Sequence, residues 1–192
     1  MHSFLIITLT LLTSSTAVRI RNFNGRNCRS STYGECQNVR ATDCCDARRG
    51  KSYYTSSMFS GLPTTAIGSI CTQSGRKNCG TVRQSGHGLS LCLTNGNSRG
   101  SYWFDCRSCR KREDDPSSDL ELAMAHPALD SVEPDIVSIE GHRFYTNGST
   151  PVEIRDAIFD YLGADALYVD IPETFRVYEL PEPVGEDDHE QY

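Results

Sequence analysis

Short apolar runs alternate with small polar residues and glycines between residues 18 and 112. Runs of this length, rich in β-branched and aromatic residues and bounded by turn signals, are typical of strands. No stretch in this part repeats apolar residues at helical spacing. We therefore predict a β domain of Greek-key or sandwich type. Its strands are predicted at residues 18–23, 52–59, 65–71, 89–94 and 101–104, with turns at Asn24-Gly25, Ser74-Gly75 and Asn95-Gly96.

The pattern changes near residue 136, where one helix is predicted among short strands. Thr150, Pro151 and Glu153 have the types and spacing of a helix N-terminus, with Thr at the N-cap and Glu closing a capping box. Gly163 stands where a helix commonly ends. The apolar helix face is Ile154, Ile158, Tyr161 and Leu162, and strands are predicted at 136–139, 143–146, 167–171 and 174–180. Residues 136–180 are thus predicted to form a small β-α-β-β module, which makes the whole chain α+β.

Two further segments connect and follow these units. Residues 113–135 are predicted to be an acidic flexible linker, in which an apolar patch interrupted by Pro127 forms either a brief helix or part of the linker. Residues 181–192 are predicted to be an acidic disordered tail. A module of about 45 residues without disulfides is small for independent folding. We therefore expect it to dock on the first domain.

The beginning of the chain has the pattern of a secretory signal peptide. An apolar run over residues 4–12 is followed by small residues, and cleavage is expected between Ala17 and Val18. The run is about half of the ~20 residues that a membrane-spanning helix needs. No later stretch is long enough to span a bilayer. We predict that residues 1–17 are removed and that the protein is secreted.

Nine cysteines are confined to the first domain, at Cys28, Cys36, Cys44, Cys45, Cys71, Cys79, Cys92, Cys106 and Cys109. In an exported protein such density predicts a disulfide framework, which compensates for a hydrophobic content of only 38%. Cys44 and Cys45 point apart in an extended chain and are expected to reach different partners. Cys106 and Cys109 either close on each other or supply two bridges. The ninth thiol is free, buried or paired with another molecule, which would give a disulfide-linked dimer.

The net charge of −6 conceals a reversal along the chain. Residues 18–112 hold 16 Lys and Arg against 4 Asp and Glu, a net of +12, whereas residues 113–192 hold 3 against 21, a net of −18. A cationic exported domain is attracted to anionic surfaces, acidic cell-wall polymers or an acidic host protein. No nucleic-acid recognition motif is present. The predicted binding residues are Arg48, Arg49, Lys51, Arg110, Lys111 and Arg112.

Two modification sites are predicted from local sequence. Lys111-Arg112 is a dibasic pair at the charge reversal, where a processing protease would separate the two halves. The alternative is a charged linker between permanently joined domains. Asn147-Gly148-Ser149 is an N-glycosylation sequon.

Catalytic and metal-binding signals are weak. No nucleophile elbow or His-Glu-x-x-His motif occurs. Glu35 and His87 are the acid/base candidates for a ribonuclease-like or wall-acting hydrolase. A four-thiolate zinc site could be formed by Cys44, Cys45, Cys106 and Cys109, but disulfides are favoured for these cysteines. No cofactor or metal is predicted. A role without catalysis is favoured.

Three short pieces of the first domain resemble small secreted cysteine-rich proteins of fungi. They are residues 22–28, the pair Cys44-Cys45 and residues 56–63. Some of those proteins are similar to βγ-crystallin Greek keys. The crystallin-type calcium loop has acidic or Asn residues before a Thr/Ser-Ser pair, but Lys51 and Ser52 precede Thr55-Ser56 here. The resemblance implies a toxin- or effector-like virulence protein, and the absence of those oxygen ligands argues against calcium binding.

The leading hypothesis is a secreted, glycosylated, non-enzymatic toxin or effector whose cationic domain binds an anionic target. Its acidic C-terminal segment would mask that domain until it is cut away. The alternatives are the hydrolase and a disulfide-linked wall or matrix protein.

Overall fold

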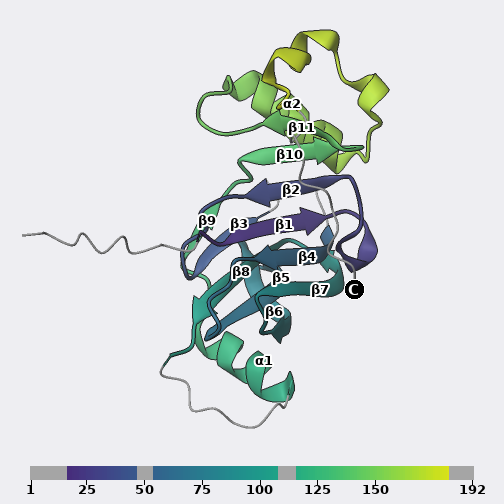
Figure 1. The fold of residues 1–192 in the computed structure, drawn as a ribbon. Helices are drawn as coiled ribbons and strands as arrows, with labels where there is room; N and C mark the ends of the chain where they lie inside the picture. The colour runs from purple at the N-terminus through teal and green to yellow at the C-terminus, as the bar shows by residue number, and fades with distance from the viewer. Residues whose placement is uncertain (1–16, 47–53, 108–115, 182–192) are drawn as a thin grey trace, which may run out of the picture.

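Two β-sheets form the body of the molecule (Figure 1). The structure is a computed structural model and describes residues 17–46, 54–107 and 116–181. Sheet A has the strand order β11-β10-β2-β1-β4-β7 and sheet B the order β6-β5-β8-β3-β9. Sheet A consists of β1 (Arg19–Phe23), β2 (Tyr33–Cys36), β4 (Tyr54–Ser60), β7 (Ser90–Ser98), β10 (Ile136–Ile139) and β11 (His142–Tyr145). Sheet B consists of β3 (Asp43–Asp46), β5 (Ala66–Ser74), β6 (Lys77–Gly86), β8 (Gly100–Asp105) and β9 (Asp130–Val132).

The main core lies between the two sheets. Ile20 and Phe59 of sheet A and Ile70 of sheet B are fully buried there. Side chains alternate along a strand, so their neighbours in sequence point the opposite way. We call the face of each sheet that meets the other its inner face, and the opposite face its outer face. The predicted disulfide-rich β domain is confirmed.

The disulfides follow this alternation. Cys45 faces inward and bonds Cys36, whereas Cys44 faces outward and bonds Cys79, so the adjacent cysteines have different partners, as predicted. A third bridge joins Cys28 to Cys92, and Cys106 is also disulfide-bonded. Cys71 is the free thiol among the described cysteines, and it is buried. Cys109 lies outside the described residues.

The segment predicted to be a flexible linker is folded over most of its length. Helix α1 (Pro116–Ala125) packs on the outer face of sheet B, where Ala123 and Ala128 join a buried cluster with Tyr102 and Phe104. Strand β9 then pairs in parallel with β3. The linker prediction was wrong from residue 116 onward because its few apolar side chains cover an apolar sheet face.

The acidic half is built into both sheets rather than docked as a separate unit. Strand β10 pairs with β2 and extends sheet A, while β9 extends sheet B. Figure 1 shows α1 at one end of the molecule and α2 (Val152–Gly163) at the other. Ion pairs also join the two halves. His87 meets Asp119, and Arg143 of the acidic half meets Glu35 of the basic half, which reverses the expected signs. Strand pairing and apolar burial join the halves.

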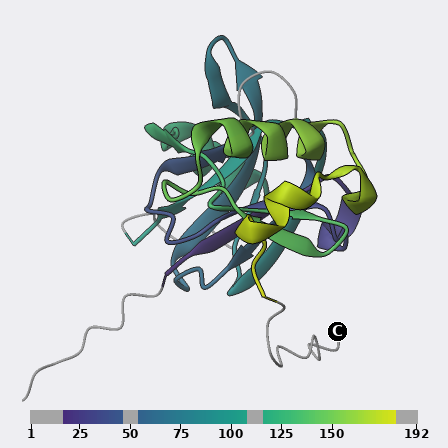
Figure 2. The same cartoon turned by 90° about the horizontal axis from the view of Figure 1, so that it is seen from above.

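The C-terminal module differs in detail from its prediction. Helix α2, the green helix of Figure 2, packs on β10 and β11. Its Ile158 and Leu162 are fully buried against Val137 and Phe144. The two later segments that were predicted as strands are instead the short 3-10 helices η2 (Tyr168–Asp170) and η3 (Glu173–Tyr178). Another 3-10 helix, η1 (Arg26–Cys28), follows β1 in the first domain. The β-α-β-β order was therefore wrong. Thr150 forms no cap, because its hydroxyl donates to the carbonyl of Tyr145.

Sequence reasoning missed four strands, β2, β3, β6 and β9, and placed a turn at Asn95-Gly96, which lies inside β7. Strand β6 is polar because it forms an edge of sheet B.

Helix α2 has 12 residues and α1 has 10, so no helix in the described part of the chain could cross a bilayer.

Candidate binding face

The outer face of sheet A carries a row of side chains that crosses all six strands. Directly paired residues of neighbouring antiparallel strands point to the same face, so the register defines the row. The row is Tyr145, Ile136, Glu35, Arg21, Met58 and Cys92. The next row on one side contains Arg143 and Tyr33, which both pair with Ser138 of β10. The next row on the other side contains Arg19. We call this surface the arginine face, defined by Arg19, Arg21, Arg143, Tyr33 and Tyr145 around Glu35.

Glu35 organises the arginine face. Its side chain is fully buried, and Arg21 Nε donates to Oε2 at 2.6 Å while Gln37 Nε2 donates to Oε1 at 2.8 Å. Arg19 Nε lies 3.6 Å and an Arg143 terminal nitrogen 3.8 Å from Oε1. One carboxylate therefore fixes the direction of three guanidinium groups that come from two strands far apart in sequence.

The environment of Glu35 keeps it ionised. Burial alone would raise its pKa, but hydrogen bonds from Gln37 and Arg21 and the charges of Arg21 and Arg19 outweigh burial, so the pKa is lowered. A general acid needs a raised pKa near the working pH. Glu35 is thus suited to orienting arginines and not to donating a proton.

The arginine face retains positive charge that water can reach. Three guanidinium groups surround one carboxylate, and the side chains of Arg19, Arg21 and Arg143 are 42%, 30% and 20% exposed. Nε of Arg143 is buried with no hydrogen-bond partner in the described structure. Arg21 lies 5.2 Å from the ring centre of Tyr33, a cation–π contact. Tyr145 is 41% exposed and is available for stacking. Guanidinium groups arranged in this way recognise carboxylate, sulfate or phosphate oxygens.

One end of the arginine face is closed by the segment around η1. Cys28 is held there by its bridge to Cys92 of β7 and by a hydrogen bond from its N–H to Ser56 Oγ at 3.0 Å. Ser56 Oγ in turn donates to the carbonyl of Gly25 at 2.6 Å. The bridge and these two bonds fix a wall beside the arginines, so the face is preorganised.

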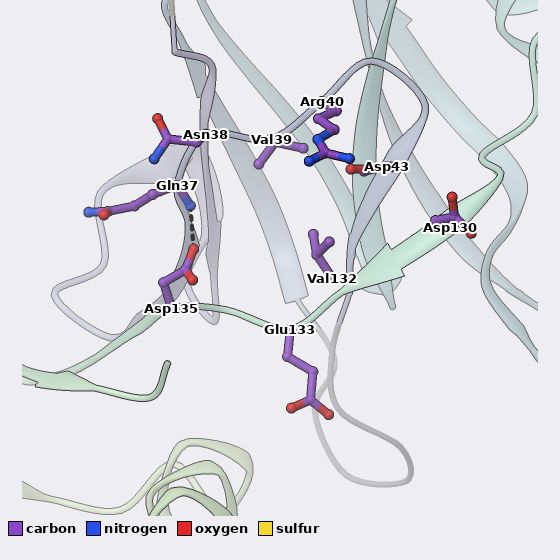
Figure 3. Close-up of a pocket in the computed structure, with 9 residues that line it drawn as sticks. All are labelled: Gln37, Asn38, Val39, Arg40, Asp43, Asp130, Val132, Glu133 and Asp135. Carbon is purple, nitrogen blue, oxygen red and sulfur yellow. Dashed lines mark hydrogen bonds between the residues drawn. The ribbon is translucent and has the colours of Figure 1, made fainter. Parts of the chain in front are cut away.

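A cavity of about 420 Å³ is lined in part by Gln37, which also bonds Glu35 of the arginine face. Figure 3 shows the side chains that line this cavity. It lies between the segment after β2 and the segment from β9 to β10, which Gln37 N–H joins by donating to Asp135 Oδ2 at 2.8 Å. Val39 and Val132 belong to or pack against the main core. The lining residues are Gln37, Asn38, Val39, Arg40, Asp43, Asp130, Val132, Glu133 and Asp135.

The cavity has the opposite charge to the arginine face. Four carboxylates and a single arginine line it. An anionic ligand would be repelled there, so the cavity is not part of an anion-binding surface. In the described part of the chain, no group of three or more His, Cys, Asp or Glu side chains is arranged to hold a metal ion.

The two predicted acid/base residues do not form a site. Glu35 lies on the outer face of sheet A, where its side chain contacts Gln37 and arginines. His87 follows β6 of sheet B, and its Nδ1 is 3.0 Å from Asp119 of α1. No described contact joins Glu35 to His87, and the hydrolase hypothesis gains no support.

Most other predicted site residues lie outside the described residues. They are Arg48, Arg49, Lys51, Arg110, Lys111 and Arg112. Ala17 is exposed and Val18 is buried, with its carbonyl accepting from Val39 N–H at 2.9 Å. Asn147 is half-buried in the turn before α2, while Gly148 and Ser149 are exposed. Cleavage before Val18 and glycosylation of Asn147 stay predictions.

The comparison with protein families bears on the first part of the chain. The model of the ARB_05566_N family, described as an N-terminal domain, matches residues 19–135, which is more than half of the chain. The chain belongs to the ARB_05566_N family. No curated protein and no solved structure matches it. The matched range passes the charge reversal at residue 112 and includes α1 and β9, but it ends before β10.

Arg143 is the functional candidate that sequence reasoning missed. It belongs to the acidic half, outside the family match, yet it faces Glu35 across β10. The alternation of β11 could have placed it on one sheet face. Its approach to Glu35 depends on the pairing of β10 with β2, which no local pattern predicts.

Proposed function

We propose that this protein is an exported, disulfide-stabilised binding protein without catalytic activity, and that the arginine face binds a polyanionic target such as an acidic cell-wall polymer. The observation that carries the proposal is the cluster of Arg19, Arg21 and Arg143 around a buried, ionised Glu35. Because the ionised carboxylate of Glu35 already holds the three arginine side chains in place, binding requires little reorganisation of these side chains, which favours affinity. Tyr145 adds a flat surface against which a sugar ring can pack.

Export is part of the proposal, and the disulfides support it. Bridges persist in secreted proteins, whereas cytosolic thiols are kept reduced. Their presence is compatible with the signal-peptide pattern of residues 1–17. By its resemblance to fungal secreted cysteine-rich proteins, we place the protein among toxin- or effector-like molecules.

The acidic half is assigned a different role from the predicted mask. Its described contacts cover apolar surface and pair with strand edges, and Arg143 adds to the positive charge of the arginine face. We therefore propose that the acidic half completes the sandwich. A cut after Arg112 would leave two associated chains, held without a covalent bond because no cysteine follows Cys109.

Mass spectrometry of the secreted product tests this part of the proposal. Denaturing analysis measures whether the chain begins at Val18, whether it is cut at Arg112 and whether Asn147 carries a glycan. Native analysis of any cut product should give the summed mass of both chains. Release of the acidic chain under native conditions would instead support the removable mask.

A polymer-binding assay tests the arginine face. We expect the protein to bind dextran sulfate and not uncharged dextran. Arg19→Gln combined with Arg143→Gln should weaken binding by roughly tenfold at low salt, because two charges near the polymer are lost. Arg21 is left intact because it is the main partner of Glu35. The matched control is Arg76→Gln with Lys77→Gln, which removes two exposed charges at the turn between β5 and β6. Equal weakening by both pairs would contradict a localised face.

A further inference from the structure

A free thiol and a disulfide share the outer face of sheet B. Cys71 of β5 is fully buried and belongs to one apolar cluster with both halves of the Cys44–Cys79 bridge. Cys44 comes from β3 and Cys79 from β6. Three sulfur atoms from three strands are therefore gathered in the same cluster, although they are far apart along the chain.

Gly100 shows how close the thiol and the bridge are. In the ladder between β5 and β8, Cys71 is the direct partner of Gly100, so both residues face the same side. A Cβ atom on Gly100 would lie 2.9 Å from Cys44 Sγ and 3.0 Å from Cys79 Sγ. Directly opposed Cβ positions are about 4.5–5.5 Å apart. The bridge thus occupies the space that a side chain opposite Cys71 would fill.

Helix α1 covers this group of sulfur atoms. Ala123 is fully buried in the same cluster, and Ala128, just after the helix, is also buried there. Tyr102 lies beside them, and its hydroxyl donates to the carbonyl of Ala123 at 2.8 Å. The cover excludes water, and burial raises the pKa of the Cys71 thiol to about 12. The nucleophile in disulfide exchange is the thiolate, so the closed molecule suppresses the reaction.

We propose that Cys71 is a latent exchange partner of the Cys44–Cys79 bridge, and that α1 prevents the exchange by covering both. When α1 lifts, Cys71 loses its proton to solvent, and the thiolate attacks one sulfur of the bridge. The bond between Cys44 and Cys79 breaks while a bond from Cys71 to the attacked sulfur forms. The displaced sulfur leaves as a thiolate and takes up a proton. The number of disulfides is unchanged, and no external oxidant or reductant is needed.

The exchange would make the covered face a redox-sensitive site. A new bridge through Cys71 ties β5 to β3 or to β6 and frees a cysteine from another strand. Such a thiol can exchange with a small disulfide or with a disulfide of a partner, which releases one thiol of that molecule. This inference does not depend on the binding role of sheet A, because the two outer faces are separate.

Thiol labelling of the full chain tests the inference. Ala123→Leu overpacks the cover, and Ala125→Leu makes the same change at an exposed position of α1. Both variants are treated with N-ethylmaleimide at pH 8 without denaturant, quenched in acid and mapped as unreduced peptides. We expect labelling in Ala123→Leu to be roughly tenfold faster, since lifting the helix raises the population of the open form. Part of the label should appear on Cys44 or Cys79, with Cys71 in a new bridge.

Two results would overturn the inference. Equal labelling rates in the two variants would show that α1 is not the cover. Label on Cys71 alone, with Cys44–Cys79 intact in every labelled molecule, would show that exchange does not occur. Adding Cys71→Ala to Ala123→Leu should abolish label on Cys44 and Cys79. If Ala123→Leu does not fold, Tyr102→Phe removes the hydrogen bond to Ala123 with little change of shape, and the same outcomes decide.

Discussion

The two outer faces of the sandwich differ in what covers them. The outer face of sheet A is polar, partly open to water and centred on Glu35 with its arginines. The outer face of sheet B is apolar and lies under α1, with Tyr102 and Phe104 buried. The acidic half contributes to both, through Arg143 on the first and α1 on the second.

This difference indicates that the charged face serves to attract a partner and that the buried face serves to stabilise the fold. A charged group keeps its attraction for a distant partner only where it stays near water, as the arginines do. An apolar face without a cover would be an aggregation hazard, which the helix removes. Substitutions of buried side chains on either face should therefore affect stability, and those of water-exposed side chains on the open face should mainly affect binding.

The largest expected effect is on the covered face. Tyr102→Ala removes a fully buried ring and the hydrogen bond to Ala123, so it should lower the free energy of unfolding by about 3–5 kcal/mol. Tyr145→Ala, the same change on the open face, should alter it by less than about 0.5 kcal/mol. Urea unfolding with the disulfides intact measures both. Similar losses in the two variants would contradict the difference between the faces.

A second effect concerns the wall of the arginine face. Replacing Cys28 and Cys92 by Ser removes a bridge between residues 64 positions apart, and should lower the free energy of unfolding by about 2–4 kcal/mol. The segment around η1 should then exchange its amide hydrogens faster, while β5 and β8 keep their protection. Hydrogen exchange read by mass spectrometry resolves these regions, and uniform loss of protection would speak against a local wall.

Glu35 gives an intermediate effect that depends on pH. Glu35→Gln leaves three arginines without their carboxylate and should destabilise the protein by about 1–3 kcal/mol at pH 7. The loss should be smaller than for a fully buried ion pair, because the arginine side chains are partly exposed to water. The folded-state pKa of Glu35 is lowered, so its contribution is present above the unfolded value of about 4.3 and is lost as the pH falls through the folded pKa. Stability curves of wild type and Glu35→Gln should converge below about pH 4. A gap of constant size across the acid range would exclude this role.

The smallest effect is on affinity alone. Tyr145→Ala should weaken binding to dextran sulfate by about twofold to fivefold, the worth of one exposed aromatic contact. Binding by wild type and Tyr145→Ala is compared at one low salt concentration by titration calorimetry. Unchanged affinity would remove Tyr145 from the arginine face and leave the arginines as its only contacts.

The sequence predicted what depends on local pattern. Strands β1, β4, β5, β7 and β8, helix α2 and the different partners of Cys44 and Cys45 follow from alternation, turn residues and helical spacing. Strand β3 was missed because its four residues are two aspartates around two cysteines, a sequence with little strand propensity that tertiary pairing overrides.

The candidate site was less predictable than the fold. Glu35 was singled out as an acid, but its buried contacts with Arg21 and Gln37 depend on the register of β1 and β2. The acidic composition of residues 113–135 suggested a solvated linker, whereas its few apolar residues determine where it packs. The charge counts give the net charge of each half, but they did not predict that the halves pair through their strands.

The most direct measurement is the salt dependence of dextran sulfate binding in three proteins. These are wild type, Arg19→Gln with Arg143→Gln, and Arg76→Gln with Lys77→Gln. Counterion release makes the logarithm of the binding constant fall linearly with the logarithm of salt concentration, with a slope set by the number of contacting charges. The arginine face predicts that the first variant reduces the slope by about two and that the second leaves it unchanged. Parallel lines for wild type and Arg19→Gln with Arg143→Gln would contradict the central claim.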